Sequence, residues 1–284
     1  MHLQKFLRTS RTLGALGSLG DVFDKNLNGR VANNLLNTLC DNNSSFDQIY
    51  VATLAALAPA TVMIRVQGGV LPKNSDLAAY GDDWQFLYAS KCSAAQKVAD
   101  FEIGLYPITL NEWQRCRKWA LENDFDMAVG ATGLSGEGGP ENAVTEVSWY
   151  DCVKWCNAKS VMEGLEPVYR VEGEMEHFRS GEFGEYGYSN VIMRTKANGY
   201  RLPLEAEWEW AARKCISQAL PYGKGENSFA WEWCWNVEDF IPRRLGGTWT
   251  CIAATITVSG RDSYFKPDSR MYDTGFRIAR SLEN

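Results

Sequence analysis

The sequence predicts a mixed α+β domain that has few helices, short strands and much irregular chain. Three observations predict it. Helical patterns are few and widely separated, short runs of β-branched or alternating apolar residues stand between them, and the 284 residues include 11 Trp, 12 Tyr and 12 Phe. Large aromatic side chains supply the packing area that holds irregular segments in place. Apolar residues at 45% and charged residues at 23% are ordinary for a globular protein, which excludes a disordered, collagen-like or coiled-coil chain.

The first 60 residues predict a small helical extension. Apolar residues recur at steps of four through residues 27–40, and residues 47–57 have spacing compatible with a second helix. Pro59 ends this part of the chain. Residues 61–69 are a β-branched run closed by two glycines, which predicts the first strand of a main domain over residues 61–284.

Three helices are expected in the main domain. After a strand at about residues 98–106, Thr109 and Glu112 have the spacing of a capping box for a helix over about residues 110–122. Ser148 can cap a second helix that runs to about residue 160, and a third is predicted over residues 204–214. The residues expected to face inward are Trp149, Cys152, Val153 and Cys156 on the second helix and Trp208, Ala211 and Ala212 on the third.

The segments between and after these helices are predicted to be loops and short strands. Residues 130–140 contain five glycines but precede no apolar helix, so a surface loop is expected here rather than a phosphate-binding loop. Residues 170–194 are acidic and rich in Gly and Tyr, which predicts loops and a hairpin. Beyond residue 214 the pattern is one of short strands and turns.

Charge and histidine content exclude several classes of function. With 29 Lys and Arg against 35 Asp and Glu, the net charge is -6, whereas a nucleic-acid-binding protein has a basic excess or stripe. The only histidines are His2 and His177, so a three-histidine metal site cannot be built. The sequence also lacks the G-x-S-x-G, Walker, G-x-G-x-x-G and H-E-x-x-H motifs. We therefore expect neither a nucleic-acid partner nor a common catalytic site.

The cysteines are expected to be free thiols. They form no C-x2-C pairs, which excludes the usual structural zinc site, and a chain of this length needs no disulfides to fold. They are Cys40, Cys92, Cys116, Cys152, Cys156, Cys215, Cys234 and Cys251.

We expect a soluble chain without a membrane span. The most apolar window, residues 51–66, is interrupted by polar residues and by Pro59. Residues 1–20 lack the continuous apolar core of a signal peptide, and no lipid anchor is visible.

Three stretches of the main domain resemble a known family. They are Asn142-Ala-Val-Thr-Glu-Val-Ser-Trp-Tyr-Asp-Cys-Val-Lys-Trp-Cys-Asn157, Gly199-Tyr-Arg-Leu-Pro-Leu-Glu-Ala-Glu-Trp-Glu-Trp-Ala-Ala-Arg213, and the tail from Gly246-Gly-Thr-Trp249 to Gly275-Phe-Arg-Ile-Ala-Arg280. In this order and spacing they resemble the formylglycine-generating-enzyme (sulfatase-modifying factor) family, a branch of the C-type-lectin fold. Residues 63–69 and 101–113 are similar to earlier markers of that family. The resemblance covers about residues 61–280 and implies the C-type-lectin fold.

The same resemblance implies that the family's enzymatic chemistry is lost. Oxidase members need two cysteines five residues apart, and here Cys251 is the first while Ile256 stands at the second position. The iron-dependent sulfoxide synthases of this fold need a histidine cluster that the sequence does not contain. Glu205, Glu207 and Glu209 are expected to form a scaffold network and a solvated face rather than a catalytic pair. We therefore expect no enzyme activity.

The family's calcium motif is altered in this chain. The segment reads Ser228-Phe-Ala-Trp-Glu-Trp233, in which the family's Gly and Asn are replaced. Asn227, Glu226 or Asp239 could still supply the oxygen ligands that calcium takes. The expectation is nevertheless that the protein holds no metal and no cofactor.

The last 40 residues resemble the variable region of a diversity-generating retroelement protein, in which a C-type-lectin scaffold displays residues rewritten by adenine-directed mutagenesis. The region spans about residues 243–280, and its expected scaffold residues are Trp249, Arg261, Arg270 and Arg277. The expected variable, ligand-binding positions are Thr250, Cys251, Ile252, Ala254, Thr255, Gly260, Asp262, Ser263, Tyr264, Phe265, Asp268, Ser269, Tyr272 and Asp273.

The resemblance restricts which amino acids can stand at these positions. Randomising the adenines of an Asn codon gives NNC or NNT codons, which never encode Trp, Met, Lys, Gln or Glu. Every variable position obeys the restriction, whereas Lys266 and Met271 do not and are left out of the set. Tyr264, Phe265 and Tyr272 are the expected anchors, because aromatic rings give rigid contact area at low entropic cost. The alternative is a solvated C-terminal hairpin with ordinary aromatic packing.

We expect a non-enzymatic monomer whose variable region binds a protein or cell-surface ligand, and the resemblance favours the cell surface as its location. Two alternatives are kept. An oxidase of the formylglycine-generating type would require Cys251 to pair with a distant cysteine such as Cys234. A fixed carbohydrate-binding adhesin would use the alternating Trp231, Trp233 and Trp235 as a sugar platform, whereas such alternation more often indicates core packing.

Overall fold

A computed structural model describes residues 61–71, 95–133, 139–182, 190–214, 230–236, 242–246, 261–262 and 266–282. These residues form a mixed α+β fold with three helices and short strands, which confirms the predicted class. The helices are α6 (Leu110–Leu121), α7 (Trp149–Met162) and α8 (Glu205–Lys214). The strands are β1 (Met63–Val66), β2 (Gly69–Leu71), β3 (Gln96–Val98), β4 (Phe101–Gly104), β5 (Tyr169–Val171), β6 (Val191–Met193), β7 (Tyr200–Arg201), β8 (Trp231–Cys234), β9 (Arg243–Leu245), β10 (Arg261–Asp262), β11 (Thr274–Gly275) and β12 (Ala279–Ser281). The helical extension expected over residues 1–60 lies outside the described residues.

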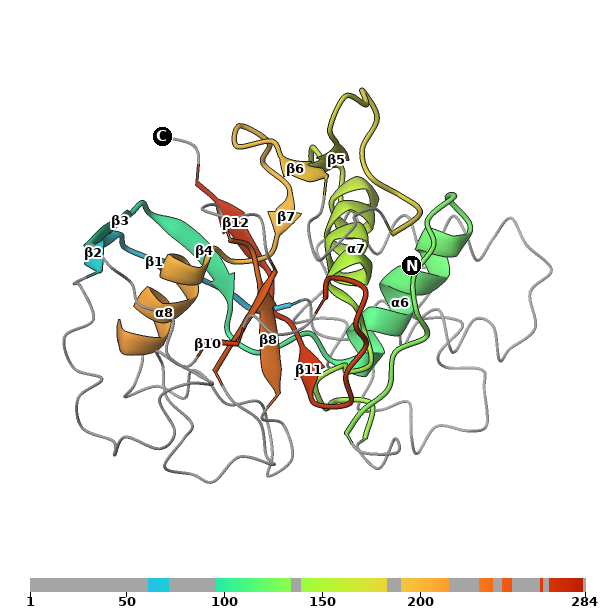
Figure 1. The fold of residues 1–284 in the computed structure, drawn as a ribbon, viewed down its shortest axis with the longest axis horizontal. Helices are drawn as coiled ribbons and strands as arrows, with labels where there is room; N and C mark the ends of the chain where they lie inside the picture. The colour runs from blue at the N-terminus through green and yellow to red at the C-terminus, as the bar shows by residue number, and fades with distance from the viewer. Residues whose placement is uncertain are drawn as a thin grey trace, which may run out of the picture. The chain divides into compact units, whose positions relative to one another are not determined.

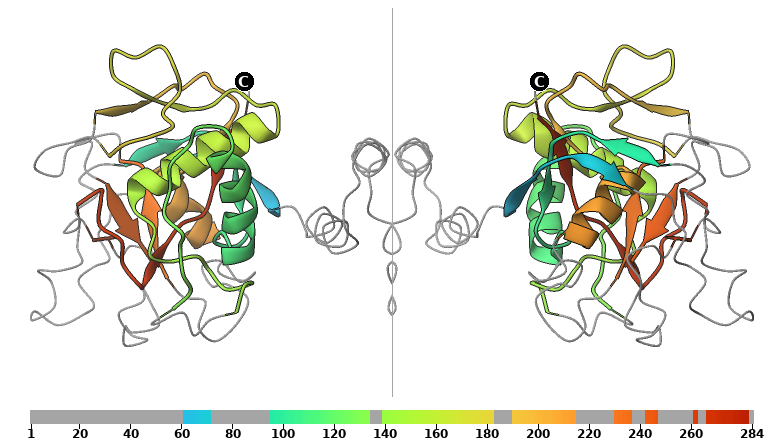
Figure 2. Two further views of the ribbon diagram at one scale, coloured as in Figure 1. Left: turned by 90° about the vertical axis from the view of Figure 1, so that its right-hand side faces the viewer. Right: turned by 90° about the vertical axis from the view of Figure 1, so that its left-hand side faces the viewer.

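Two four-stranded sheets carry the described fold. The first has the order β1-β4-β12-β7 and is antiparallel throughout, with Ala279 of β12 opposite both Ile103 and Arg201. The second has the order β10-β9-β8-β11, in which only the pair of β8 and β11 is parallel. In Figure 1, α8 lies on one side of the strands and α6 and α7 lie on the other, and the turned views of Figure 2 show the same arrangement.

The strands differ in one respect from the sequence prediction. Residues 61–69 and 98–106 were each predicted as one strand, but the structure divides this part into β1, β2, β3 and β4. The break falls at Gly68, whose N–H donates to Asp100 Oδ1 at 2.9 Å instead of continuing a ladder. The hairpin expected within residues 170–194 is confirmed, because β5 and β6 pair antiparallel.

Both long helices begin with a capping box. Thr109 accepts from the N–H of Glu112, and the Glu112 side chain accepts from the N–H of Thr109, as predicted. Ser148 and Asp151 make the same reciprocal pair at the start of α7. Such a pair satisfies donors that a helix start otherwise leaves unbonded. The exchange therefore fixes where each helix begins.

Helix α7 is buried all round rather than on one face. The four residues expected to face inward are buried, but so is every residue from Trp149 to Ser160. Polar members of the helix are buried because each meets a partner. Asn157 Nδ2 donates to the carbonyls of Tyr169 and Phe178 at 2.8 and 3.0 Å, and Ser160 Oγ accepts from Tyr200 N at 2.8 Å.

Helix α8 joins the two sheets. Its Ala211 belongs to the apolar cluster on the first sheet, and Trp208 and Ala212 pack with Cys234 and Leu245 of the second. This confirms the predicted inward face of the helix.

The glutamates of α8 form a scaffold network, as expected, but the expected solvated face is wrong. Glu207 accepts from both Nη atoms of Arg201 at 2.6 and 2.8 Å and from Leu204 N at 2.9 Å. Glu209 is buried and pairs with Arg213 of the same helix, and the side chain of Glu205 pairs with Arg243 of β9. Each of the three carboxylates therefore takes part in an ion pair within the scaffold.

The buried thiols give the first prediction. Cys116, Cys152 and Cys156 are free and buried, as expected. Burial raises the pKa of the Cys116 thiol to about 12 and raises the pKa of Cys152 and Cys156 well above the ordinary range. Iodoacetamide at about pH 8 should leave these three residues unlabelled in the native protein and label them after unfolding, as mass spectrometry of the peptides would show.

The same shifts give a pH dependence. Because the folded thiols hold their protons at a pH above the pKa of the unfolded thiols, their contribution to the free energy of unfolding is complete below about pH 8.5. It declines as the pH rises toward about 12.

In the labelling experiment, rapid reaction of iodoacetamide with native Cys152 or Cys156 would contradict the burial of α7.

Candidate ligand-binding face

The expected variable region begins on the second sheet, returns to it at β11 and ends at β12 of the first sheet. Strand β9 opens the region, β10 pairs with β9 through Arg261 opposite Leu245, and β11 closes on β8 through Thr274 opposite Trp231. The second sheet thus brings β9 and β11 together although residues 246–273 separate them in the chain. Gly246, just after β9, has φ 101° and lies against Trp208, a backbone conformation that favours glycine.

A buried ion pair fixes the C-terminal end of this region. Arg277 donates from Nη2 to Glu232 Oε1 of β8 at 2.6 Å, and its Nε donates to Oε2 of the same carboxylate. Trp208 Nε1 donates to that carboxylate at 2.8 Å, and Arg277 Nη1 donates to the carbonyl of Gly104 at 3.1 Å. Both charged side chains are at most 2% exposed. The expected scaffold role of Arg277 has a direct geometric basis in these contacts.

The residues beside Arg277 are also fixed by packing. A Cβ on Gly275 would lie 2.3 Å from the carbonyl oxygen of Val144, so only glycine fits at this close approach. The ring of Phe276 contacts Trp113 and Trp155 edge-on at centroid distances of 5.8 and 5.5 Å. Residues 275–277 therefore each have a distinct structural role.

A second charged contact lies between β9 and the start of β11. Arg244 Nη1 lies 3.3 Å from Asp273 Oδ1 and also donates to Thr274 Oγ1. The guanidinium stands 5.3 Å from the ring centroid of Trp231, within cation–π range. Asp273, one of the expected variable positions, is thus buried and takes part in an internal ion pair.

The turn over residues 266–273 rests on the start of α7. The N–H groups of Trp149 and Tyr150 both point to the carbonyl of Pro267, at 3.0 and 3.5 Å. The N–H of Glu146 donates to the carbonyl of Met271 at 2.9 Å, and Glu146 adopts φ 56° to do so. Since these contacts use main-chain atoms, they do not depend on which side chains the turn carries.

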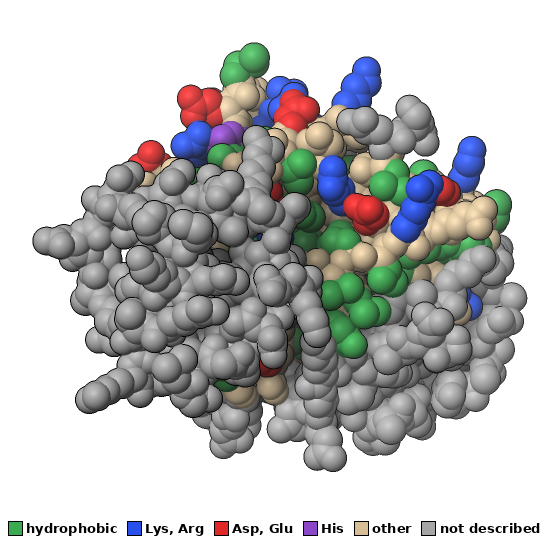
Figure 3. Space-filling model, turned by 180° about the vertical axis from the view of Figure 1, so that it is seen from behind, with side chains coloured by type: hydrophobic (Ala, Val, Ile, Leu, Met, Phe, Trp, Pro, Cys, Tyr) green, Lys and Arg blue, Asp and Glu red, His purple; other side chains and the backbone are tan. Residues whose placement is uncertain are grey.

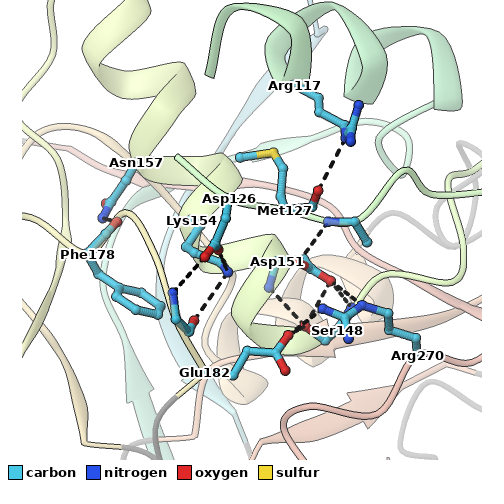
Figure 4. Close-up of polar contacts among 12 residues, drawn as sticks. Arg117, Asp126, Met127, Ser148, Asp151, Lys154, Asn157, Phe178, Glu182 and Arg270 are labelled. Carbon is cyan, nitrogen blue, oxygen red and sulfur yellow. Dashed lines mark hydrogen bonds and ion pairs between the residues drawn. The ribbon is translucent and has the colours of Figure 1, made fainter. Parts of the chain in front are cut away.

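Arg270 ties the same turn to α7 through its side chain. Its Nε donates to Asp151 Oδ2 at 2.8 Å, and its Nη2 pairs with Glu182 (Figure 4). The Asp151 side chain is fully buried, that of Glu182 is partly exposed, and that of Arg270 is 39% exposed. The guanidinium therefore reaches from the surface to the buried N-terminal turn of the helix.

The remaining expected site residues divide into two groups. Among the described residues, Asp268 is exposed and Ser269 and Tyr272 are partly exposed, while Asp262 and Arg261 form β10. The expected positions that lie outside the described residues are Trp249, Thr250, Cys251, Ile252, Ala254, Thr255, Gly260, Ser263, Tyr264 and Phe265, together with Ile256.

The alternating tryptophans of β8 and of the residue that follows it are buried. Trp231, Trp233 and Trp235 are at most 4% exposed, which confirms the prediction of core packing. The alternative, that these rings form a sugar platform, is wrong. Trp233 Nε1 donates to the carbonyl of Val147 at 3.0 Å, so the indole N–H also has its hydrogen-bond partner within the core. Both faces of the strand are covered, so alternate residues along it do not divide into a solvent-exposed face and a buried face.

Three residues of the site were missed from the sequence. Asp151 had a signal, because Ser148-Trp-Tyr-Asp151 has capping-box spacing. Glu232 lies within the altered calcium motif, and nothing in that motif indicates its ion pair with Arg277. Arg244 had no sequence signal, because its partners Asp273 and Thr274 are distant in the chain.

Two further properties concern the described residues as a set. In those ranges, no helix is both long and apolar enough to cross a lipid bilayer, and no three Cys, His, Asp or Glu side chains converge as metal ligands. The candidate calcium ligands Asn227, Glu226 and Asp239 lie outside the described residues.

The face of the molecule opposite to the view of Figure 1 carries charges of both signs. Among its described residues, Lys and Arg side chains are interspersed with Asp and Glu side chains (Figure 3).

Comparisons with known proteins place this geometry in a wider group. Residues 51–243 match the family described as sulfatase-modifying factor enzyme 1-like domain. A chaperone protein, LppX of Paenibacillus barcinonensis, is 34% identical over 164 residues, which are 56% of this chain and 53% of the relative. The chain thus spans about half the length of that relative.

Two solved structures share the fold. The crystal structure of CarF is similar with a TM-score of 0.58 and 21% identity over 79% of this chain and 99% of that one. Treponema denticola variable protein 1 is similar with a TM-score of 0.53 and 20% identity over 77% of this chain and 94% of that one.

The buried ion pair gives a prediction on stability. Glu232→Gln should lower the free energy of unfolding by about 3–5 kcal/mol, because it leaves the Arg277 guanidinium buried without its counter-charge. Chemical denaturation measures the loss. Glu166→Gln is the matched control, since its ion pair with Arg194 joins side chains that are nearly half exposed and should contribute no more than about 1 kcal/mol. Equal losses in the two variants would contradict the assignment.

Neighbouring positions in the variable region should respond differently to truncation. Asp273→Ala should lower the free energy of unfolding by about 1–3 kcal/mol, because Arg244 loses its buried carboxylate partner. Tyr272→Ala should lower it by less than about 1 kcal/mol.

Grouped Ala substitution of Tyr264, Phe265 and Tyr272 should leave the melting temperature nearly unchanged. A large loss in that grouped variant would support ordinary aromatic packing instead of a binding face.

Proposed function

Because the chain belongs to the sulfatase-modifying factor enzyme 1-like family and has its C-type-lectin-like fold, we propose that it is a non-enzymatic binding protein on this scaffold. Its ligand-binding face is the variable region of about residues 243–280, diversified by a retroelement. The ligand is a protein or another macromolecule on a cell surface, and the protein acts as a monomer at that location.

One observation carries the proposal. The turn over residues 266–273 is held by main-chain atoms, by Arg270 and by the pair of Asp273 with Arg244, and none of those contacts uses the side chains of Asp268, Ser269 or Tyr272. These three positions can therefore change without removing what holds the turn. Separating the groups that fix the backbone from the groups that face outward is what a diversified binding surface requires.

The extent of the family match supports the same proposal. The match ends at residue 243, where the variable region begins, although β11, β12 and the Arg277–Glu232 pair continue the fold beyond it. The stretches Gly246-Gly-Thr-Trp249 and Gly275-Phe-Arg277 still resemble the family, so a departure confined to the positions between them is consistent with diversification. Similarity to a structure titled variable protein 1 agrees with this reading.

The absence of enzyme activity is part of the proposal. The oxidase pair is incomplete in sequence, because Ile256 replaces the second cysteine. Cys234, the distant partner that an oxidase would need, lies buried in β8 against Trp208 and Leu245. The relative named as a chaperone supports a role in binding rather than in catalysis.

A display library tests the proposal. The full chain is displayed with NNC and NNT codons at the variable positions other than Asp273, and hen egg-white lysozyme serves as the probe. The prediction is folded members with Kd values below about 1 µM, because the contacts that hold the described turn do not use the side chains of Asp268, Ser269 or Tyr272. A library of equal size randomised over the exposed residues 172 and 174–176 is the control. Loss of folding in most members, or no better yield than the control, would overturn the proposal.

A further inference from the structure

The constant residues that hold the binding turn form one connected chain of polar contacts. We propose that Asp151, Arg270 and Glu182 are positioning residues that preorganise the turn over residues 266–273 for binding. We name this group the arginine clamp. The inference rests on the proposed function, because it assigns the device that keeps a changing surface in one backbone conformation.

The buried end of the clamp is rigid. Asp151 Oδ1 accepts from Ala128 N at 3.0 Å, and Oδ2 accepts from Ser148 N and Ser148 Oγ, both at 2.9 Å. Arg270 Nε completes the set at 2.8 Å. Both carboxylate oxygens are therefore used, and the orientation of Asp151 is fixed before Arg270 binds to it. Its charge has no access to water, so Arg270 supplies the compensation.

The surface end of the clamp is also anchored. Glu182 follows Gly181, whose N–H donates to Asp126 Oδ2 at 2.9 Å and whose carbonyl accepts from Lys154 Nζ at 3.2 Å (Figure 4). Lys154 also pairs with Asp126, and its side chain is 2% exposed. Lys154 belongs to α7, as does Asp151. Both carboxylates of the clamp are thus held, directly or through Gly181, by the same helix.

This arrangement places Arg270 between two carboxylates, one on α7 and one on the segment that α7 holds through Gly181. The turn is attached at Pro267 and Met271 by main-chain hydrogen bonds and at Arg270 by two carboxylates. Ser269 N donates to the carbonyl of Lys266 at 3.0 Å inside the turn. A loop that is ordered before binding loses less entropy when it binds, which increases affinity without any new contact. The clamp is the side-chain part of this preorganisation.

Hydrogen–deuterium exchange on the parent chain tests the clamp without a ligand. Arg270→Gln should raise amide exchange over residues 266–273 by about tenfold while exchange in α6 stays unchanged. Arg270→Lys keeps the charge but has a single ammonium group. Its amide exchange over residues 266–273 should therefore lie between that of the parent chain and that of Arg270→Gln. Arg65→Gln is the matched control, because it removes the exposed ion pair with Asp100 on a different sheet. Unchanged exchange over residues 266–273 in folded Arg270→Gln would overturn the proposal.

A lysozyme-binding clone from the library tests the consequence for binding. Arg270→Gln in that clone should weaken the Kd about tenfold or more, chiefly through faster dissociation, with the fold retained. Glu182→Gln removes only the partly exposed partner and should weaken the Kd by about two- to fivefold. An unchanged Kd in both variants would overturn the clamp. So would unfolding of Arg270→Gln combined with unchanged binding in Glu182→Gln, because the pairs would then serve global stability alone. Failure to obtain any binder would instead count against the proposed function, and the exchange measurement would still decide the clamp.

Discussion

The buried pair of Arg277 and Glu232 is the interaction on which the described fold depends. Glu232 belongs to the second sheet, Arg277 precedes β12 of the first, and Trp208 of α8 donates to the same carboxylate. One ion pair therefore joins both sheets and the helix between them. A buried charge pair is stable only when the remaining donors and acceptors are satisfied, and the carbonyl of Gly104 and the Trp208 indole supply that here. Because Arg277 lies near the end of the variable region, after its last variable position Asp273, the pair also sets where that region returns to the core.

A second constraint comes from the buried helix α7. Its N-terminal turn binds residues 266–273 through main-chain amides and through Asp151, and its Lys154 supports the segment that carries Glu182. The helix can be buried on all sides because its polar residues each find a partner in a neighbouring segment. Among the described contacts, the side chains that hold residues 266–273 thus lie outside the set expected to vary, except that of Asp273. In physical terms, specificity can change there at little cost in stability.

Local signals predicted much of the fold. The capping box at Thr109, the N-cap at Ser148 and the inward face of α8 were predicted correctly, because they depend on residues three or four positions apart. Partners distant in the chain could not be predicted. Nothing near Glu209 in the sequence indicates that it is buried, and nothing near Glu205 indicates its pair with Arg243. The pairs of Glu232 with Arg277 and of Arg244 with Asp273 exist only once the sheet has formed. The same limit explains Asp273, which obeys the codon restriction but is buried against Arg244.

The most direct measurement is the sequence of the 3′ end of the gene, with its neighbouring DNA, in many isolates. The proposed diversification predicts differences confined to the variable codons, with Arg270 and Arg277 constant and substitution at Asp273 rarer than at Tyr272. It also predicts a nearby template that is almost identical and carries AAC or AAT at those codons, beside a reverse transcriptase gene. An invariant 3′ end without such a template would contradict a diversified binding protein.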